Sequence, residues 1–228
     1  MAVNIIYEDD NLIVVFKPAG LATQTKKVGE KDLVSELKKH LKGGYVGVIH
    51  RLDQPVEGLL VFAKDAKTAA KLSAQVQKKG DTFVKDYVAV SICSSTVDVG
   101  KTVCLENYMV KTKEQTALII DKADIGKYPE AKLAKLSYEV LEVKNGLAFV
   151  RVHLQTGRFH QIRAQLKNAG LQILGDRKYG DDENKELALK KGVRHVLLCA
   201  DKLEFSHPIT GKLLEFSTES EDIKRGFE

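Results

Sequence analysis

The sequence predicts an α+β fold built on a mixed, mainly antiparallel sheet. Short apolar or β-branched runs outnumber helical patterns, and several neighbouring runs are joined by turn-forming residues, as in hairpins. With 228 residues, 43% of them hydrophobic, and no long Pro/Gly/Ser linker, the chain can bury one substantial core. We therefore expect one domain over residues 1–228.

Strands are expected where apolar or alternating runs are bounded by turn residues. These runs are 5–7, 12–16, 46–49, 59–63, 83–92, 136–143 and 147–154. Asp9-Asp10-Asn11 joins the first two runs as a hairpin turn. Asn145-Gly146 joins the last two, and this pair suits a type I′ turn because both central residues need positive φ.

Helices are expected where apolar residues recur every three or four positions behind a capping residue. The segments are 33–41, 66–79 and 158–169, and the charged segment 181–191 is left open between helix and loop. Asp32 and Asp65 are suitable N-caps, and Gly80 and Gly170 are suitable stops. The segment 120–134 has no clear period and is expected to be a surface loop.

Asp53 lies in a polar break between two expected strands. His50-Arg51-Leu52-Asp53 follows the run 46–49 and precedes the run 59–63. A rigid scaffold often displays its chemistry on such a loop. A loop Asp also commonly caps a turn or pairs with a neighbouring Arg, here Arg51. The residue pattern alone leaves these interpretations open.

Residues 83–92 alternate with period two. Val88 and Val90 share one face of the expected strand, whereas Lys85 and Tyr87 share the other. Tyr87 therefore points away from the most aliphatic face. A strand Tyr more often packs with a satisfied hydroxyl than takes part in catalysis, so this residue has two interpretations.

Arg163 lies at the border of the apolar stripe of the helix expected from residue 158. The stripe consists of Phe159, Ile162 and Leu166. His160 lies on a different side of this helix, away from the stripe. A partly buried guanidinium needs a carboxylate partner, and Asp53 is the candidate.

The charge and the cysteine content indicate what kind of partner and which cellular compartment suit this protein. The net charge is +5 and the pI is about 8.9, with four Lys-Lys pairs that are ordinary solvated surface but are compatible with an acidic polymer. Three cysteines without a C-x-x-C pair suit reduced thiols in a cytoplasm. No run is long enough to span a membrane and no secretory signal is visible, so we expect a cytoplasmic protein without a membrane partner.

Several short motifs follow one another along the chain. They are Lys17-Pro18-Ala19-Gly20-Leu21, His50-Arg51-Leu52-Asp53, Lys85-Asp86-Tyr87, the run Thr156-Gly157-Arg158-Phe159-His160-Gln161-Ile162-Arg163, Ile173-Leu174-Gly175-Asp176 with Tyr179-Gly180, and His207-Pro208. In this order they resemble the RluA-type RNA pseudouridine synthases, over about residues 5–217. The resemblance implies a pseudouridine synthase fold, with a curved sheet flanked by helices and a central RNA-binding cleft. It also implies a catalytic domain without the N-terminal accessory RNA-binding domain of some relatives.

The resemblance implies that the protein isomerises uridine to pseudouridine in structured RNA, either rRNA or tRNA. Asp53 matches the family's catalytic Asp, Tyr87 its active-site Tyr and Arg163 its ion-pairing Arg. Substrate-binding roles are expected for His50, Arg51, Arg158, His160 and Gln161. No metal or cofactor is expected. We expect a monomer that acts on an RNA stem-loop without an obligate protein partner.

Other functions fit the sequence less well. A glycosidase needs paired carboxylates, and a serine hydrolase needs a G-x-S-x-G that is absent. The alternative is a catalytically inactive RNA-binding protein that keeps the fold, although binding alone would not require Asp53, Tyr87 and Arg163 together. Glu57 departs from the family, which commonly has Ser there, and we expect this carboxylate to affect substrate choice.

Overall fold

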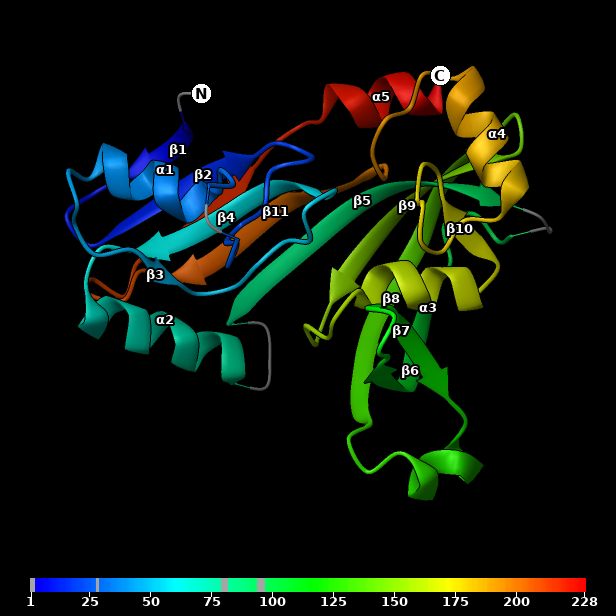
Figure 1. The fold of residues 1–228 in the computed structure, drawn as a ribbon, viewed down its shortest axis with the longest axis horizontal. Coiled ribbons are helices and arrows are strands. Elements are labelled where there is room, and N and C mark those ends of the chain that lie inside the picture. Colours follow the sequence, from blue (N-terminus) through cyan, green and yellow to red (C-terminus); the bar gives the residue numbers. More distant parts are fainter. Residues whose placement is uncertain (1–2, 28, 79–81, 94–96) are drawn as a thin grey trace. The chain divides into compact units, whose positions relative to one another are not determined.

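The chain forms two compact units, each made of two stretches of sequence (Figure 1). The computed structural model describes residues 3–27, 29–78, 82–93 and 97–228. Unit 1 contains Met1–Lys85 and Ala200–Glu219, and unit 2 contains Asp86–Cys199 and Ser220–Glu228. The single domain expected from the sequence stays a prediction. Among the described residues, no helix has the length and apolar character needed to cross a membrane.

Unit 1 is built on antiparallel strands. Its elements are β1 (Asn4–Glu8), β2 (Leu12–Lys17), α1 (Leu33–His40), β3 (Gly47–Val48), β4 (Glu57–Ala63), α2 (Ala66–Gln77), the start of β5 (Phe83–Cys93), most of β11 (Leu198–Ser206) and β12 (Leu213–Ser217). The strands lie in the order β1-β2-β4-β11, with β3 also beside β4 and β12 beside β11. The pairs β1–β2, β2–β4, β3–β4 and β11–β12 are antiparallel, as expected for a mainly antiparallel sheet, and β1–β2 is the hairpin predicted over Asp9-Asp10-Asn11.

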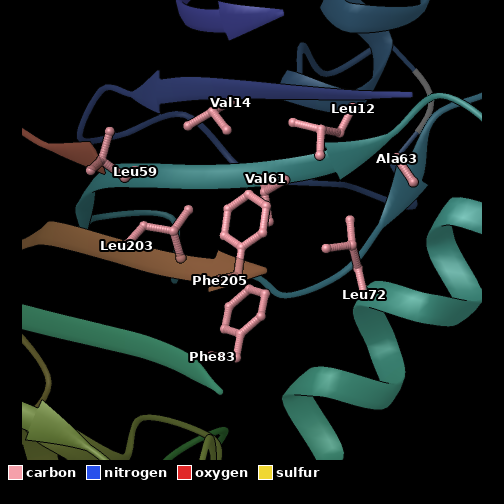
Figure 2. Close-up of a cluster of buried hydrophobic side chains, with 9 residues drawn as sticks. All are labelled: Leu12, Val14, Leu59, Val61, Ala63, Leu72, Phe83, Leu203 and Phe205. Carbon is pink, nitrogen blue, oxygen red and sulfur yellow. The ribbon is translucent and has the colours of Figure 1, made fainter. Parts of the chain in front are cut away.

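A cluster of apolar side chains fills the core of unit 1 (Figure 2). Its members are Leu12, Val14, Leu59, Val61, Ala63, Leu72, Phe83, Leu203 and Phe205. The rings of Phe83 and Phe205 stack with their centroids 5.5 Å apart and their planes 18° apart. Full burial of a Leu-sized or Phe-sized side chain contributes about 1.5–3 kcal/mol. Leu72 is fully buried, so this cluster holds α2 against the strands.

Both helices of unit 1 begin at the predicted caps. The Asp32 carboxylate accepts from the Ser35 amide at 2.7 Å, and the Asp65 carboxylate accepts from the Thr68 amide at 2.8 Å. Each bond satisfies a backbone donor that the first turn of a helix leaves without a partner. Helix α2 ends at Gln77. The stop predicted at Gly80 lies outside the described residues.

His207 joins the β1–β2 turn of unit 1 to the β11–β12 hairpin through hydrogen bonds, which we call the histidine clasp. His207 Nδ1 lies 3.2 Å from the Ile209 amide and 3.1 Å from the Thr210 amide, and it accepts from both. The ring proton is therefore on Nε2, which donates to Asp9 Oδ2 at 3.0 Å. The same Asp9 side chain also accepts from the Asn11 amide inside the β1–β2 turn. The clasp thus fixes both turns at once.

Unit 2 contains the remaining elements. They are the rest of β5, β6 (Thr102–Lys111), β7 (Ala117–Ile120), a 3-10 helix (Lys122–Lys127), β8 (Lys132–Lys144), β9 (Leu147–Leu154), α3 (Gln161–Asn168), β10 (Leu171–Ile173), α4 (Asp182–Lys190), the start of β11 and α5 (Glu221–Phe227). The strands lie in the order β5-β9-β8-β6-β7, with β10 beside β5, and all of these pairs are antiparallel. Helix α4 settles the open choice for 181–191 in favour of a helix.

The Asn-Gly hairpin is confirmed. Asn145 has φ +52° and Gly146 has φ +75°, as both central positions of a type I′ turn require. Lys144 pairs with Leu147 directly across this two-residue turn. Local sequence therefore specifies the connection between β8 and β9.

Two predicted boundaries were wrong. The segment 120–134 is not only a loop: its first residue ends β7, and β8 begins at Lys132 because Lys132 and Ala134 pair with β6. The helix expected from residue 158 begins at Gln161. His160 caps it with φ +50°, a left-handed conformation that cannot continue a helix backwards.

We expect Gly58→Ala to destabilise unit 1 severely. Gly58 has φ +127°, and an added Cβ would lie 2.4 Å from the backbone N and O of Ala200. Strain and overpacking together should cost about 3 kcal/mol or more in the free energy of unfolding, measured by urea denaturation. Gly146→Ala is the matched control, because its added Cβ would meet nothing within 4 Å and only strain of about 1–2 kcal/mol remains. Equal losses in the two variants would contradict the packing argument.

Candidate active site

Asp53 lies on the loop between β3 and β4, as predicted. The opening segment of the chain holds this loop in place through backbone atoms. Thr23 Oγ1 donates to the Leu52 carbonyl at 2.9 Å and accepts from the Leu52 amide at 3.2 Å. The Gly20 amide donates to the Gln54 carbonyl at 2.9 Å. Residues on both sides of Asp53 are therefore fixed, although the segment has no regular secondary structure.

Lys17 also supports the Asp53 loop. It is 0% exposed at the end of β2, and its ammonium donates to the carbonyls of Leu21 at 2.7 Å and Gln54 at 3.2 Å, as well as to Pro18 at 3.0 Å. Burial lowers the pKa of Lys17 to about 8, while the charges of Asp53 and Glu57 oppose that fall. The Glu57 carboxylate therefore helps to keep the buried cation charged.

His50 is a neutral ring that links the same loop to β4. Burial and the nearby Lys85 ammonium lower the pKa of His50 to about 3. Its Nε2 accepts from the Val61 amide at 3.5 Å, a long bond, and its Nδ1 is shielded from solvent without a hydrogen-bond partner in the described residues. Burial also lowers the pKa of Lys85. RNA binding by His50 stays a prediction.

Arg51 lies two residues before Asp53, and its side chain is exposed to solvent. Among the described residues it forms no ion pair with a carboxylate. The alternative in which Asp53 serves mainly as the partner of Arg51 is therefore not seen. An exposed guanidinium on this loop is available for a phosphate group.

Arg163 is buried on α3 and held by a carboxylate. Its Nε donates to Asp176 Oδ2 at 2.7 Å, and its Nη2 donates to Asp176 Oδ1 at 2.6 Å, with both side chains at most 4% exposed. The prediction that a buried Arg163 needs a carboxylate partner is confirmed, and this partner is Asp176. Asp53 belongs to unit 1 and Arg163 to unit 2, so their pairing stays a prediction.

Tyr179 connects this ion pair to the β6–β7 hairpin. Its ring lies 5.1 Å from the Arg163 guanidinium carbon, a cation–π distance. Its hydroxyl accepts from the Ala117 amide at 2.6 Å and lies 3.0 Å from His160 Nδ1. His160 was expected on the helix away from the apolar stripe, but it precedes the helix with a left-handed backbone and is buried against Tyr179. Its contact with RNA stays a prediction.

Gln161 holds the segment before α3. Its Oε1 accepts from Thr156 Oγ1 at 2.8 Å and from the Arg158 amide at 2.9 Å, while its Nε2 donates to Gln165 Oε1 at 2.9 Å. The side chain is buried and its polar atoms are already used, which favours a structural role. Arg158 is exposed and donates through Nε to the Leu133 carbonyl. Substrate binding by either residue stays a prediction.

Tyr87 is 5% exposed and is the second residue of unit 2. It lies on β5 opposite Val152 of β9, and residues 87–91 are all buried, so both faces of the strand are covered there. Beside it, Asp86 Oδ1 lies 2.7 Å from Nδ1 of His153, the residue directly opposite on β9. This cross-strand pair fixes the strand next to Tyr87. The catalytic role of Tyr87 stays a prediction.

Comparison with known proteins identifies the family. A family model described as RNA pseudouridylate synthase matches residues 11–168. The chain belongs to the RNA pseudouridylate synthase family, which confirms the RluA-type resemblance drawn from its motifs. The matched range includes Asp53, Tyr87 and Arg163.

Curated relatives cover most of the chain. Ribosomal large subunit pseudouridine synthase C of Rickettsia felis is 36% identical over 211 residues, which are 91% of this chain and 64% of that protein. The chain thus spans slightly less than two thirds of this relative. tRNA pseudouridine synthase C of Pasteurella multocida is 34% identical over 92% of this chain and 88% of that protein.

Two solved human structures share the fold. RNA pseudouridylate synthase domain containing 4 superposes with a TM-score of 0.73 at 22% identity, over 98% of this chain and 91% of that one. RNA pseudouridylate synthase domain containing 1 gives a TM-score of 0.71 at 19% identity, over 96% of this chain and 83% of that one. The predicted pseudouridine synthase fold is confirmed.

Two residues that support the site carry only weak signals in the sequence. Lys17 belongs to a motif and directly follows the apolar run of β2, a position at which a buried cation would need partners. Asp176 likewise belongs to a motif. It follows a Gly after the β10 pattern, and its distance from α3 in sequence hides its contact with Arg163.

We expect Lys17→Met to remove a pH dependence of stability. The unfolded chain holds the Lys17 proton up to a pKa near 10.5, whereas the folded chain holds it only up to about 8. The buried charge therefore costs stability in full below pH 8, and wild-type stability should rise relative to the variant between about pH 8 and 10.5. Urea unfolding across this range measures the difference. The control Lys27→Met, at an exposed position, should follow the wild type, and parallel curves for Lys17→Met and wild type would refute the burial of the charge.

We expect Asp176→Asn to weaken unit 2 strongly. The change keeps the size of the side chain but removes the negative charge that binds the buried Arg163 guanidinium through two bonds, at a cost of about 3–5 kcal/mol in the free energy of unfolding. Asp182→Asn is the control, because this exposed carboxylate pairs with Lys185 on the surface of α4, and its loss should change stability little. Similar stability of the two variants would show that the Asp176 pair is dispensable.

Proposed function

We propose that this chain is an RNA pseudouridine synthase that converts uridine to pseudouridine in structured RNA. The observation that carries the proposal is Asp53 on a loop fixed by Lys17 and Thr23, within a chain that belongs to the pseudouridylate synthase family. A carboxylate that reacts with a flipped-out nucleotide needs such fixed placement, because a small shift of a reacting group lowers the rate by a large factor.

The reaction breaks the bond between N1 and C1′, turns the uracil and joins C5 to C1′. The C5 proton is lost and N1 gains one, so the change is an isomerisation. Asp53 would act on the ribose or base as nucleophile or base. Tyr87 would lie against the flipped base and assist loss of the C5 proton, since a phenol offers both a π-face and a hydroxyl. Arg163 would place a cation beside Asp53. No cofactor enters this scheme.

The proposed substrate is a loop of rRNA or tRNA. Relatives are named for each kind of RNA: the Rickettsia felis enzyme for the ribosomal large subunit and the Pasteurella multocida enzyme for tRNA. A target base must leave its stack, and this cost of a few kcal/mol is lowest in single-stranded loops. We place the protein in the cytoplasm, with these RNAs. Action as a monomer, without an obligate protein partner, stays a prediction.

We expect Asp53→Asn to abolish pseudouridine formation while leaving RNA affinity almost unchanged, because Asn keeps the size of the side chain and loses its charge and basicity. The assay counts pseudouridine in rRNA and tRNA after incubation with the purified protein, and affinity is measured separately by fluorescence anisotropy. Asp98→Asn, an exposed carboxylate paired with Lys101, is the control and should keep full activity. Substantial turnover by Asp53→Asn would falsify the assignment. An inactive wild type that binds RNA would favour the RNA-binding alternative.

A further inference from the structure

Two adjoining loops of unit 2 collect basic side chains outside the Arg163–Asp176 pair. Arg177 and Lys178 follow Asp176 on the loop between β10 and α4, and Arg194 and His195 lie on the loop after α4. We call these four residues the basic platform. All four are exposed. None of them belongs to the residues already discussed for the reaction.

The two loops are tied to each other through backbone atoms. The Leu197 amide donates to the Leu174 carbonyl at 2.9 Å, and Arg177 Nη2 lies 3.4 Å from the Arg194 carbonyl, which accepts from it weakly. The buried Asn184 side chain also donates to the Ile173 carbonyl at 2.9 Å. The platform therefore has a fixed base, which reduces the ordering cost of binding a ligand.

The positive charge of the platform is not neutralised from within the protein. Across the described parts of the chain, none of the four side chains forms an ion pair with a carboxylate. Four nearby carboxylates are engaged elsewhere: Asp176 with Arg163, Asp181 as the cap of α4, Asp182 with Lys185 and Glu186 with Lys190. Adjacent like charges repel, so this cluster favours a polyanionic partner.

Lys178 shows that the platform also connects to the β6–β7 hairpin. Its ammonium donates to the Gln115 carbonyl at 2.7 Å, which leaves further N–H groups of the same cation available. Arg177 and Arg194 offer planar guanidinium groups, whose paired donors fit phosphate oxygens. The donor chemistry of the cluster is thus that of a phosphate-binding surface.

We propose that the basic platform binds the sugar–phosphate backbone of the RNA strand that flanks the target nucleotide. The inference rests on the proposed function, because it takes Arg163 to lie at the reacting centre. Asp176, which holds Arg163, is the immediate neighbour of Arg177 in the chain. RNA bound on the platform therefore lies close to Arg163. Such contacts fix the register of the strand without reading its sequence.

The test compares two double variants with the same loss of charge. R177Q/R194Q removes two platform cations and keeps side-chain donors, whereas K185Q/K190Q removes two lysines of α4 that are already paired with acids. Each protein is titrated with fluorescein-labelled oligouridylate over a range of salt concentrations. We expect R177Q/R194Q to reduce the slope of log affinity against log salt by about 1.4, which is 0.7 for each lost phosphate contact. At 0.1 M salt this corresponds to about a 5-fold loss of affinity per contact, whereas K185Q/K190Q should match the wild type.

Three outcomes would overturn the proposal. The first is an unchanged slope in R177Q/R194Q, and the second is an equal loss in K185Q/K190Q, which would indicate a general effect of net charge. The third is unchanged RNA affinity together with lost binding of a labelled poly-glutamate peptide, which would assign the platform to an acidic protein surface. Unfolding curves for both variants establish that they are folded. Because binding is measured without turnover, a failure of the platform differs from a failure of the proposed isomerase activity, which the Asp53→Asn assay reports.

Discussion

The buried ammonium of Lys17 is the interaction on which the Asp53 loop depends. This ammonium binds the Gln54 carbonyl of the loop together with the Pro18 and Leu21 carbonyls of the segment after β2, and so ties the two segments to each other. Removing a charge from water is costly unless hydrogen bonds and opposite charges compensate. Asp53 and Glu57 provide those charges. The unusual Glu57 thus has a physical role in unit 1, since it helps to hold the proton on the cation that organises the loop.

Unit 2 also buries a cation, but it compensates the charge in a different way. Arg163 is 4% exposed and Lys17 0%, and the Asp176 carboxylate binds Arg163 through two bonds. A guanidinium stays protonated at any pH at which proteins fold, whereas a buried ammonium does not. The charge on α3 is therefore permanent, and the charge below the Asp53 loop depends on pH. The Tyr179 ring and hydroxyl extend the Arg163 network to the β6–β7 hairpin.

Local chemistry explains which features could be predicted. The caps Asp32 and Asp65 and the turn Asn145-Gly146 involve bonds within a few residues, so their sequence carries the full signal. The left-handed His160 and the early start of β8 depend on partners distant in sequence, and periodicity cannot reveal them. The position of Asp53 on a loop followed from the flanking strands. The choice of Asp176 as partner of Arg163 did not, because the apolar stripe indicates burial but says nothing about which carboxylate lies opposite.

The discontinuity of unit 1 has a consequence for the order of folding during synthesis. Its first 85 residues leave the ribosome well before β11 and β12, which supply Leu203 and Phe205 to its core and His207 to the clasp with Asp9. Until then β4 lacks its neighbour β11, although β2 and β3 can already pair with it, whereas most of unit 2 emerges as one continuous stretch. Unit 2 can therefore assemble its strands first. Contacts between segments so distant in sequence close slowly, so the unit that carries Asp53 completes its core only after β11 and β12 have emerged.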